Sequence, residues 1–210
     1  MIRILVADDH PVVRQGLKQI IADSYDMVVA GEASDGQEVL EQVRKNDYDV
    51  VLLDISMPSR SGLDILKQLK IEKPGLAFLI LSVHPEQQYA VRALKAGASG
   101  YLTKDHAPEE LIAAIRAVAS GKKYLSSSLA QELAAQLGTA TRKLPHQTLS
   151  DREYSILLLI ASGSTKRGIA QKLLLSPKTV STYRSRILKK MGLNSDAELV
   201  RYALENQLLD

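Results

Sequence analysis

The sequence predicts two domains: a doubly wound α/β domain with a five-stranded parallel sheet, followed by a smaller all-α domain of four helices. Three observations predict this. Short apolar runs alternate with helix-period segments over the first 120 residues, and this alternation is typical of a parallel sheet covered by helices on both faces. Four helical patterns separated by turn signals fill the last 60 residues. The charge also changes sign, from 13 basic and 17 acidic residues over 1–120 to 10 basic and 6 acidic residues over 145–210.

Five βα units make up the first domain, which we expect to span residues 1–121. Apolar runs predict its strands at Ile2–Ala7, Met27–Ala33, Val50–Leu53, Ala77–Ser82 and Gly100–Thr103. Amphipathic segments predict its helices at 11–23, 36–46, 61–72, 86–96 and 108–120.

A linker is expected over residues 122–146. Residues 126–137 within it could form a helix. The stretch GTATRKLPHQT that follows has the small, polar and Pro residues of a flexible connection.

Capping signals divide the second domain, residues 147–210, into its helices. Ser150 and Glu153 have the spacing of a capping box before DREYSILLLIAS. Ser176-Pro177 is an N-cap followed by Pro at the first helical position of KTVSTYRSRILKKM, which ends before Gly192. Ser195 caps a last helix, expected at 196–207.

The composition excludes several classes of protein. No apolar run approaches the roughly 18 residues of a membrane span, and the start MIRILVADDH lacks the pattern of a secretory signal. The absence of Cys excludes disulfides, thiol catalysis and Cys-based zinc sites, and it favours a reducing cytoplasm. An acidic first part joined to a basic last part is the asymmetry expected of a sensor attached to a polyanion-binding domain.

Acidic side chains follow two of the predicted strands at their carboxyl ends, where doubly wound sheets carry their ligand chemistry. Asp8 and Asp9 follow the first strand, and Asp54 follows the third. Three carboxylates at one edge repel each other unless a cation lies among them. Oxygen ligands without His or Cys suit a hard ion, so the sequence predicts a Mg²⁺ site.

Ser82 and Lys104 end the fourth and fifth strands at the same edge. With a divalent ion they suit phosphoryl transfer: Asp54 is a competent nucleophile, and the metal and Lys104 would neutralise the phosphoryl oxygens. Ser82 would donate a hydrogen bond to the bound group. Taken alone, Asp8 or Asp9 could simply cap a helix, and Lys104 could be a solvated surface lysine. Their occurrence together at one edge favours a site.

Residues 1–121 resemble the receiver domain of bacterial response regulators, a CheY-like domain with a flavodoxin-like fold. The paired acids Asp8-Asp9, Asp54 in LLDISMPSRSGL, Ser82, Tyr101 and Lys104 carry the resemblance. It implies that Asp54 is the phosphoacceptor. It also implies that Asp9 and Asp54 bind Mg²⁺ directly, Asp8 mainly through water, and Ser56 through its backbone carbonyl.

The resemblance further implies a switch, in which phosphorylation draws Ser82 towards the new oxygens and the Tyr101 ring turns inward. One departure concerns the loop after Lys104. In many receivers a Pro with a cis peptide bond follows this lysine, whereas Asp105 stands here. A cis bond before a residue other than Pro costs about 3–4 kcal/mol, so the geometry of this loop stays open.

The segment TKRGIAQKLLLSPKTVSTYRSRILKKM predicts a helix-turn-helix, the motif that places its second helix in a major groove of DNA. Between Tyr154 and Ser195 there is no acidic residue. The helical period turns one set inward, Val180, Ile187, Leu188 and Met191. It turns a polar and basic set outward, Ser181, Thr182, Ser185, Arg186 and Lys189, which suits base edges and phosphates. A basic helix that is only solvated is the alternative.

Residues 147–210 resemble a LuxR-type DNA-binding domain. The resemblance implies groove contacts from Ser181, Thr182, Ser185 and Arg186, and backbone contacts from Lys166, Lys178, Thr179 and Lys189. It departs at Gly168, where relatives usually have Glu and where Gly weakens the helix by about 1 kcal/mol, and at Ser181, where many have a basic residue. The last helix, with Leu199, Val200 and Ala203, is implied to support dimer formation.

Together the two resemblances match the NarL/FixJ class of response regulators. They imply a cytoplasmic transcription regulator that is not an enzyme, although it could slowly lose its phosphoryl group by self-hydrolysis. The implied partners are a sensor histidine kinase, promoter DNA, RNA polymerase and, after phosphorylation, a second copy of the chain. Two alternatives stay open: DNA binding independent of phosphorylation, and an Asp54-nucleophile phosphohydrolase. The phosphohydrolase lacks support at Ser56, where dehalogenase-type phosphatases have a second Asp, and no cap domain is evident.

Overall fold

The computed structural model describes residues 1–57, 62–84, 86–126, 129–131, 144–206 and 208–209. Its contacts divide the chain into two compact units, Met1–Ala135 and Gln136–Asp210. No helix among the described residues is both long and apolar enough to cross a membrane.

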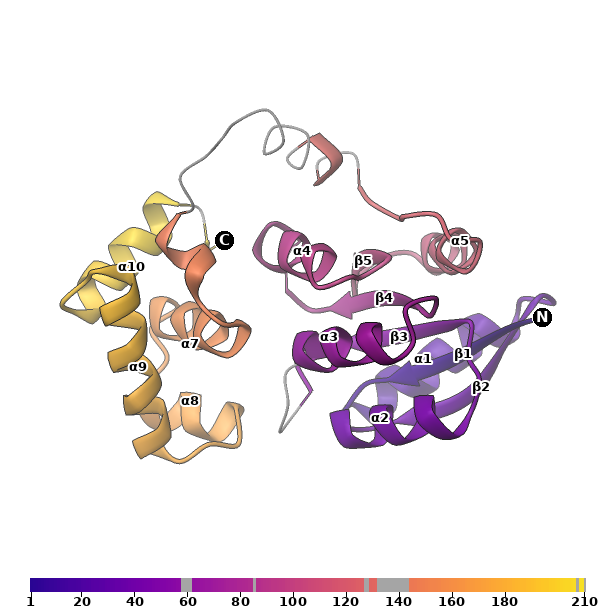
Figure 1. The fold of residues 1–210 in the computed structure, drawn as a ribbon, viewed down its shortest axis with the longest axis horizontal. Helices are drawn as coiled ribbons and strands as arrows, with labels where there is room; N and C mark the ends of the chain where they lie inside the picture. Colours follow the sequence, from indigo (N-terminus) through magenta and orange to yellow (C-terminus); the bar gives the residue numbers. More distant parts are fainter. Residues whose placement is uncertain (58–61, 85, 127–128, 132–143, 207, 210) are drawn as a thin grey trace. The chain divides into compact units, whose positions relative to one another are not determined.

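The first unit is a five-stranded parallel sheet with the strand order β2-β1-β3-β4-β5 (Figure 1). Its strands are β1 (Ile2–Ala7), β2 (Met27–Ala33), β3 (Val50–Asp54), β4 (Ala77–Ser82) and β5 (Gly100–Thr103). All five predicted strands are confirmed, and β3 extends one residue further, so that Asp54 is its last residue. Every residue of β3 and β4 is buried, as expected for central parallel strands covered on both faces.

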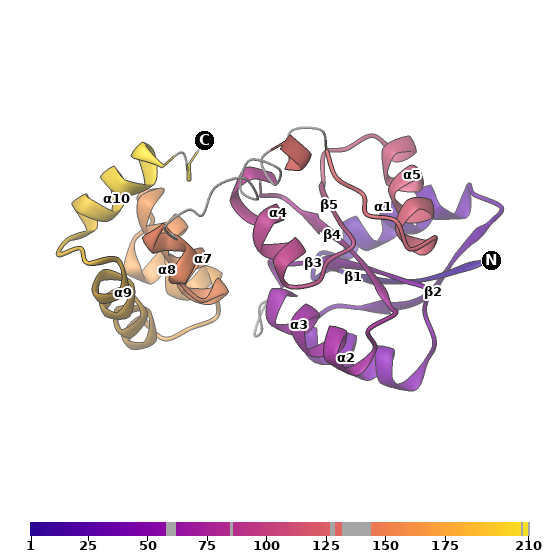
Figure 2. The ribbon, with the colours of Figure 1, turned by 45° about the horizontal axis from the view of Figure 1, so that its top comes forward.

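Helices cover both faces of this sheet (Figure 2). They are α1 (Pro11–Ala22), α2 (Gly36–Lys45), α3 (Gly62–Glu72), α4 (Glu86–Lys95) and α5 (Pro108–Ala119). One face carries α1 and α5, and Leu17, Ile21 and Ile115 pack there against Leu52 and Leu79 in a single core. The other face carries α2, α3 and α4. The predicted doubly wound fold is therefore confirmed.

Gly62 holds the loop after β3 close to the site-bearing strand. A Cβ at this position would lie 2.5 Å from the carbonyl oxygen of Asp54 and 2.7 Å from the Cα of Ile55. Both distances are shorter than any side chain tolerates, and the Gly62 N–H donates to the Ile55 carbonyl. Glycine thus allows α3 to begin directly against the end of β3.

The second unit contains a 3₁₀ turn, η1 (Pro145–Thr148), and the helices α7 (Asp151–Ala161), α8 (Lys166–Lys172), α9 (Pro177–Met191) and α10 (Asp196–Glu205). The four predicted helices are confirmed, and the last is two residues shorter than expected. Ser150 and Glu153 form the predicted capping box. Gly192 ends α9 in the left-handed conformation with φ 68°, which glycine adopts without steric cost. Tyr154, Ile187 and Leu199 lie in the core of this unit.

The first residues of the predicted linker pack against the sheet of the first unit. Tyr124 forms a parallel bridge with Gly100, and its N–H donates to the Ser99 carbonyl. Most of the helix expected at 126–137 lies outside the described residues. Within it, 129–131 are helical and Leu129 is buried.

Candidate functional site

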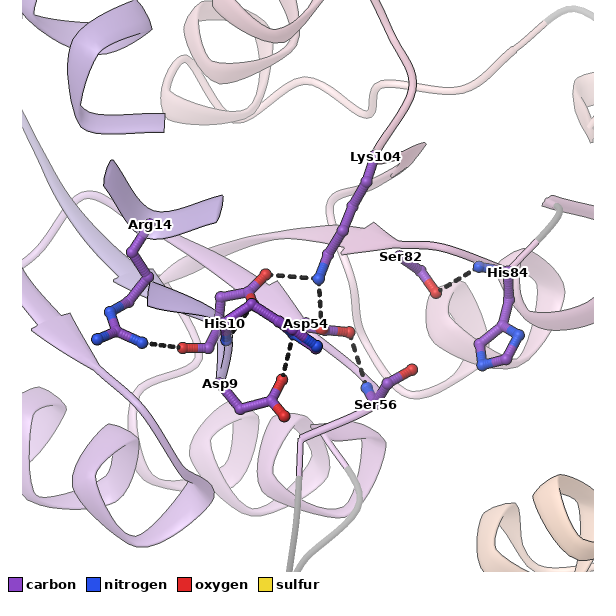
Figure 3. Close-up of polar contacts among 9 residues, drawn as sticks. Asp9, His10, Arg14, Asp54, Ser56, Ser82, His84 and Lys104 are labelled. Atoms are coloured by element: carbon purple, nitrogen blue, oxygen red, sulfur yellow. Dashed lines mark hydrogen bonds and ion pairs between the residues drawn. The ribbon is translucent and has the colours of Figure 1, made fainter. Parts of the chain in front are cut away.

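The three predicted acids meet at the carboxyl edge of the sheet (Figure 3). β1 and β3 are neighbouring strands, with Ala7 opposite Leu53, so the residues that follow or end them come together. One oxygen each of Asp8, Asp9 and Asp54 and one ring nitrogen of His10 lie within 4.8 Å of one another. Asp8 and Asp54 are each only 1% exposed.

Lys104 reaches this cluster from the end of β5. Its Nζ lies 2.5 Å from Asp8 Oδ2 and 2.6 Å from Asp54 Oδ2, and its backbone N–H donates to the Ser82 carbonyl. The described residues, which include Lys104 and Asp105, contain no cis peptide bond. The departure at Asp105 is therefore compatible with the predicted site, because Lys104 contacts Asp54 although the peptide bond between Lys104 and Asp105 is trans.

Burial and charge act against each other in this cluster. Burial raises the pKa of Asp54, and the Lys104 ammonium and the Ser56 N–H offset only part of that effect. Burial also opposes the charge on Lys104, but the adjacent Asp54 and Asp8 carboxylates outweigh it and raise the pKa of the lysine. One ammonium among three carboxylates leaves an excess of negative charge, which a divalent cation would neutralise.

The donor atoms fit Mg²⁺. Asp8 Oδ2 and Asp9 Oδ1 are buried. Lys104 Nζ lies 2.5 Å from the first oxygen, and His10 Nδ1 lies 2.9 Å from the second. Carboxylate oxygens are the donors that Mg²⁺ prefers, and the single Lys104 ammonium does not balance the charge of three carboxylates. Ser56, whose N–H donates to Asp54 Oδ1 over 2.8 Å, lies beside the cluster. The use of its carbonyl as a ligand stays a prediction.

The predicted switch residues lie on the strands next to Asp54. Ser82 is fully buried, and its Oγ accepts the N–H of His84 over 3.1 Å. The Tyr101 hydroxyl donates to the carbonyl of the same His84 over 2.8 Å, and the ring is only 2% exposed. Burial raises the pKa of Tyr101. The ring is therefore already inward in this structure, and its rotation stays a prediction.

Two side chains near the cluster were missed by the sequence interpretation. His10 Nδ1 lies 2.9 Å from Asp9 Oδ1 and 3.3 Å from Asp8 Oδ1. Arg14 Nη1 donates to the Asp8 carbonyl over 2.7 Å. The only signal for His10 was its place directly after the two acids, and that place alone does not say where the ring points.

The predicted DNA-contacting residues of the second unit, here called the basic face, are mostly exposed. Lys166, at the start of α8, and Thr182, Ser185, Arg186 and Lys189, on α9, are exposed, as is Lys178. Thr179 and Ser181 are half-buried. On the opposite side of α9, Val180, Ile187 and Met191 are buried as predicted, and Leu188 is half-buried.

Ion pairs separate the basic face from the other basic residues of α9. Arg184 pairs with Asp196 over 2.7 Å, and Lys190 pairs with Glu153 over 2.6 Å. Within the described part of the chain, the four cations of the basic face, Lys166, Lys178, Arg186 and Lys189, have no ion-pair partner. These charges remain available for an external polyanion.

The hydroxyl groups of α9 make only local hydrogen bonds. Ser181, Thr182 and Ser185 each donate to the carbonyl four residues earlier. Such hydrogen bonds leave the lone pairs of the hydroxyl outward, so the same groups can also accept hydrogen bonds from base edges or donate to them after rotation.

Comparison with known proteins identifies both domains. The family model for the response regulator receiver domain matches residues 4–116, and the model for bacterial regulatory proteins of the luxR family matches residues 147–203. This chain is a two-component response regulator of the NarL/FixJ class. A response regulator with a DNA-binding domain is consistent with the expectation that the chain is not an enzyme.

Relatives match this response regulator over nearly its whole length. It is 39% identical to the response regulator UvrY of Escherichia coli K12, over 99% of this chain and 96% of that protein. It is also 39% identical to the response regulator GacA of Pseudomonas aeruginosa, over 100% of this chain and 99% of the relative. Among solved structures, RcsB from Salmonella enterica serovar Typhimurium, bound to the promoter rprA with the phosphate mimic BeF₃⁻, matches with a TM-score of 0.65 and 27% identity. That match covers 96% of this chain and 98% of RcsB.

Proposed function

We propose that this response regulator accepts a phosphoryl group on Asp54 from a sensor histidine kinase and, once phosphorylated, binds promoter DNA as a homodimer. The observation that supports the proposal most directly is the position of the Asp54 carboxylate, buried at the end of β3 and held between Lys104 and the acids Asp8 and Asp9. This setting places a nucleophilic carboxylate beside the Lys104 ammonium, a cation that can neutralise the oxygens of an incoming phosphoryl group.

Each residue of the site has a separate task in this proposal. Asp54 supplies the attacking oxygen, and the Ser56 N–H, which donates to its Oδ1, fixes its orientation. Lys104 stabilises negative charge on the transferred group. Ser82, whose Oγ accepts the His84 N–H, donates a hydrogen bond from its hydroxyl to the bound phosphoryl group. Asp8, Asp9, Asp54 and the Ser56 carbonyl would hold Mg²⁺, which neutralises phosphoryl oxygens when bound.

The second domain reads DNA in this proposal. Lys166, Lys178, Thr179 and Lys189 contact phosphates, whereas Ser181, Thr182, Ser185 and Arg186 enter the major groove. RcsB, which was solved bound to promoter DNA, supports the assignment by similarity. Its dimers bound to two parallel DNAs support a dimer for this chain too.

The remaining assignments follow from the same scheme. We place the receiver at 1–121, the linker at 122–146 and the DNA-binding domain at 147–210, supported by family matches at 4–116 and 147–203. The protein would act in the cytoplasm, where promoter DNA and RNA polymerase are found, and the phosphoryl group on Asp54 would be lost slowly by self-hydrolysis.

Operator selection from a random DNA pool, followed by affinity measurements, tests the proposal. The full-length protein is treated with Mg²⁺ and acetyl phosphate, phosphorylation is measured by mass spectrometry, and the affinity for the selected DNA is compared before and after treatment. We expect one phosphoryl group per chain, tighter DNA binding, and loss of both effects in Asp54→Asn. Equal DNA affinity with and without phosphorylation would favour the alternative of phosphorylation-independent binding.

A further inference from the structure

We propose that His10 supplies an imidazole ligand to the cation site of Asp8, Asp9 and Asp54, so that this site binds borderline divalent ions such as Co²⁺ and Zn²⁺ through nitrogen as well as oxygen. The inference rests on the proposed function only in placing a divalent cation among these carboxylates. It changes the expected donor set from oxygen alone to oxygen and nitrogen.

The position of the His10 ring carries the inference. One of its nitrogens belongs to a set of four potential ligand atoms that lie within 4.8 Å of one another, together with one oxygen from each of the three acids. Its Nδ1 approaches Asp9 Oδ1 to 2.9 Å and Asp8 Oδ1 to 3.3 Å (Figure 3). Ligand atoms around one divalent ion are separated by distances of this order, since each lies about 2 Å from the metal.

The backbone around His10 holds the ring at this place. The His10 N–H donates to Asp8 Oδ1 over 2.9 Å, and Pro11 follows as the first residue of α1. His10 is the N-cap residue of α1, yet its side chain makes no capping hydrogen bond. The ring is therefore not engaged in stabilising the helix and faces the carboxylates instead.

His10 and Lys104 contact different oxygens of the cluster. Lys104 Nζ contacts Oδ2 of Asp8 and Oδ2 of Asp54, whereas His10 contacts Oδ1 of Asp8 and Oδ1 of Asp9. The lysine and the imidazole therefore do not compete for the same carboxylate oxygens. Asp8, which is 1% exposed, lies between them and contacts each through a different oxygen.

The type of donor decides which ions gain from His10. Imidazole nitrogen suits Zn²⁺ and the other late first-row ions, whereas Mg²⁺ prefers oxygen and retains several waters. Almost any site binds Zn²⁺ more tightly than Mg²⁺, so a preference for Zn²⁺ alone proves nothing. The inference predicts instead that removal of the imidazole weakens the borderline ions much more than Mg²⁺.

A simple surface ion pair is the competing explanation for these contacts. The His10 side chain is 65% exposed, and exposed pairs of this kind add little to stability. Substitution of His10 should therefore leave the fold intact, so a change in metal affinity can be assigned to the lost imidazole. His106 provides a matched control, because it also lies near two acids, 4.0 Å from Asp105 and 3.5 Å from Glu110, but outside the cluster.

Metal binding to the full-length protein tests the inference. Wild type, His10→Asn and His106→Asn are titrated with Mg²⁺, Mn²⁺, Co²⁺ and Zn²⁺ at one fixed pH, and the Co²⁺ complexes are examined by pulsed EPR for coupling to ligand nitrogen. We expect His10→Asn to weaken Co²⁺ and Zn²⁺ by roughly ten-fold or more and Mg²⁺ by less than about three-fold. Nitrogen coupling should be present in the wild type and in His106→Asn and absent from His10→Asn.

The result that overturns the inference is an absence of nitrogen coupling in the wild type, or an equal loss of affinity for all four ions in His10→Asn. Phosphorylation of the wild type with acetyl phosphate and Mg²⁺ is measured on the same samples. If Asp54 is phosphorylated but no nitrogen coupling appears, the inference about His10 fails alone. If Asp54 is not phosphorylated, the proposed function fails, whatever the metal ligands are.

Discussion

At the scale of single residues, Leu174 stands out because its backbone is left-handed. Its φ is 51°, and it is the only described residue other than glycine with a positive φ. It lies between α8 and α9, and its side chain is 69% exposed. A left-handed conformation costs an ordinary L-residue about 1–2 kcal/mol, whereas Asn tolerates it better.

Leu174→Asn should therefore raise the free energy of unfolding of the second unit by about 0.5–1 kcal/mol, measured by urea denaturation. Leu204, which is 60% exposed on α10, is the matched control, because Leu204→Asn makes the same chemical change in a helical backbone. The control should be neutral or slightly destabilising. Equal destabilisation by both changes would contradict the assigned strain.

Glu153 is a second residue whose charge matters, since it belongs to the capping box of α7 and also pairs with Lys190. Burial opposes its charge, but the hydrogen bonds from Lys190 and Ser150 outweigh burial and lower its pKa below the ordinary value of 4.5. A lowered pKa in the folded state gives stability that is complete above about pH 4.5 and is lost as the pH falls through the folded-state pKa.

Glu153→Gln should reduce the stability of the second unit at pH 7 by about 1–2 kcal/mol. It should also flatten the dependence of stability on pH below about pH 4.5. Chemical denaturation from pH 3 to pH 7 measures both effects. A variant with an unchanged slope at acid pH would show that another carboxylate is responsible.

At the scale of elements, the apolar pattern predicts the strands well because β3 and β4 are buried along their whole length and leave little ambiguity of register. Caps such as Ser150 and Gly192 predict the helix ends, because a cap acts through the few residues beside it in the sequence. The arrangement of the site is harder to predict. The contact of Lys104 with Asp54 depends on a loop whose peptide geometry the sequence left open, and the contact of His10 with Asp9 depends on a side-chain rotamer.

The contact between the start of the linker and β5 was also not indicated by the local sequence pattern, because it depends on a close approach of the two backbones. A Cβ on Gly100 would lie 2.8 Å from the Tyr124 carbonyl oxygen and 3.0 Å from Leu79 Cδ1. Tyr124 also contacts α5, since its hydroxyl donates to Glu110 over 3.3 Å. The linker therefore begins as an added edge to the sheet.

Gly100→Ala should displace Tyr124 from β5. We expect the Tyr124 amide, which donates to the Ser99 carbonyl, to exchange with solvent at least about ten-fold faster, since a ten-fold change needs only about 1.4 kcal/mol of local destabilisation. Hydrogen exchange followed by mass spectrometry measures this. Gly16→Ala is the control, because a Cβ there meets no atom within 4 Å, and it should leave exchange at 122–126 unchanged.

At the scale of the whole molecule, the division of charge along the chain separates two kinds of site. The first unit concentrates carboxylates at one edge of a sheet, where they need a cation. The second unit presents cations without ion-pair partners among the described residues, on a helix stretch free of acids. The net charge of +3 conceals this division. Each unit thus presents charge that suits a ligand of the opposite sign, a divalent cation in one case and a polyanion in the other.

This division leads to a prediction about how the full-length protein binds DNA. Lys166→Ala and Lys189→Ala each remove one phosphate contact, so binding should weaken about equally for all sequences, and the slope of log affinity against log salt should fall by about one. Arg186→Ala should instead reduce the preference for the selected operator by about 1–3 kcal/mol, because a base contact is lost. Lys45→Ala removes the same charge from a helix of the first unit and should change neither quantity. If Lys45→Ala reduced the salt slope as much as Lys189→Ala, the effect would arise from net charge, and the basic face would not be the DNA-binding surface.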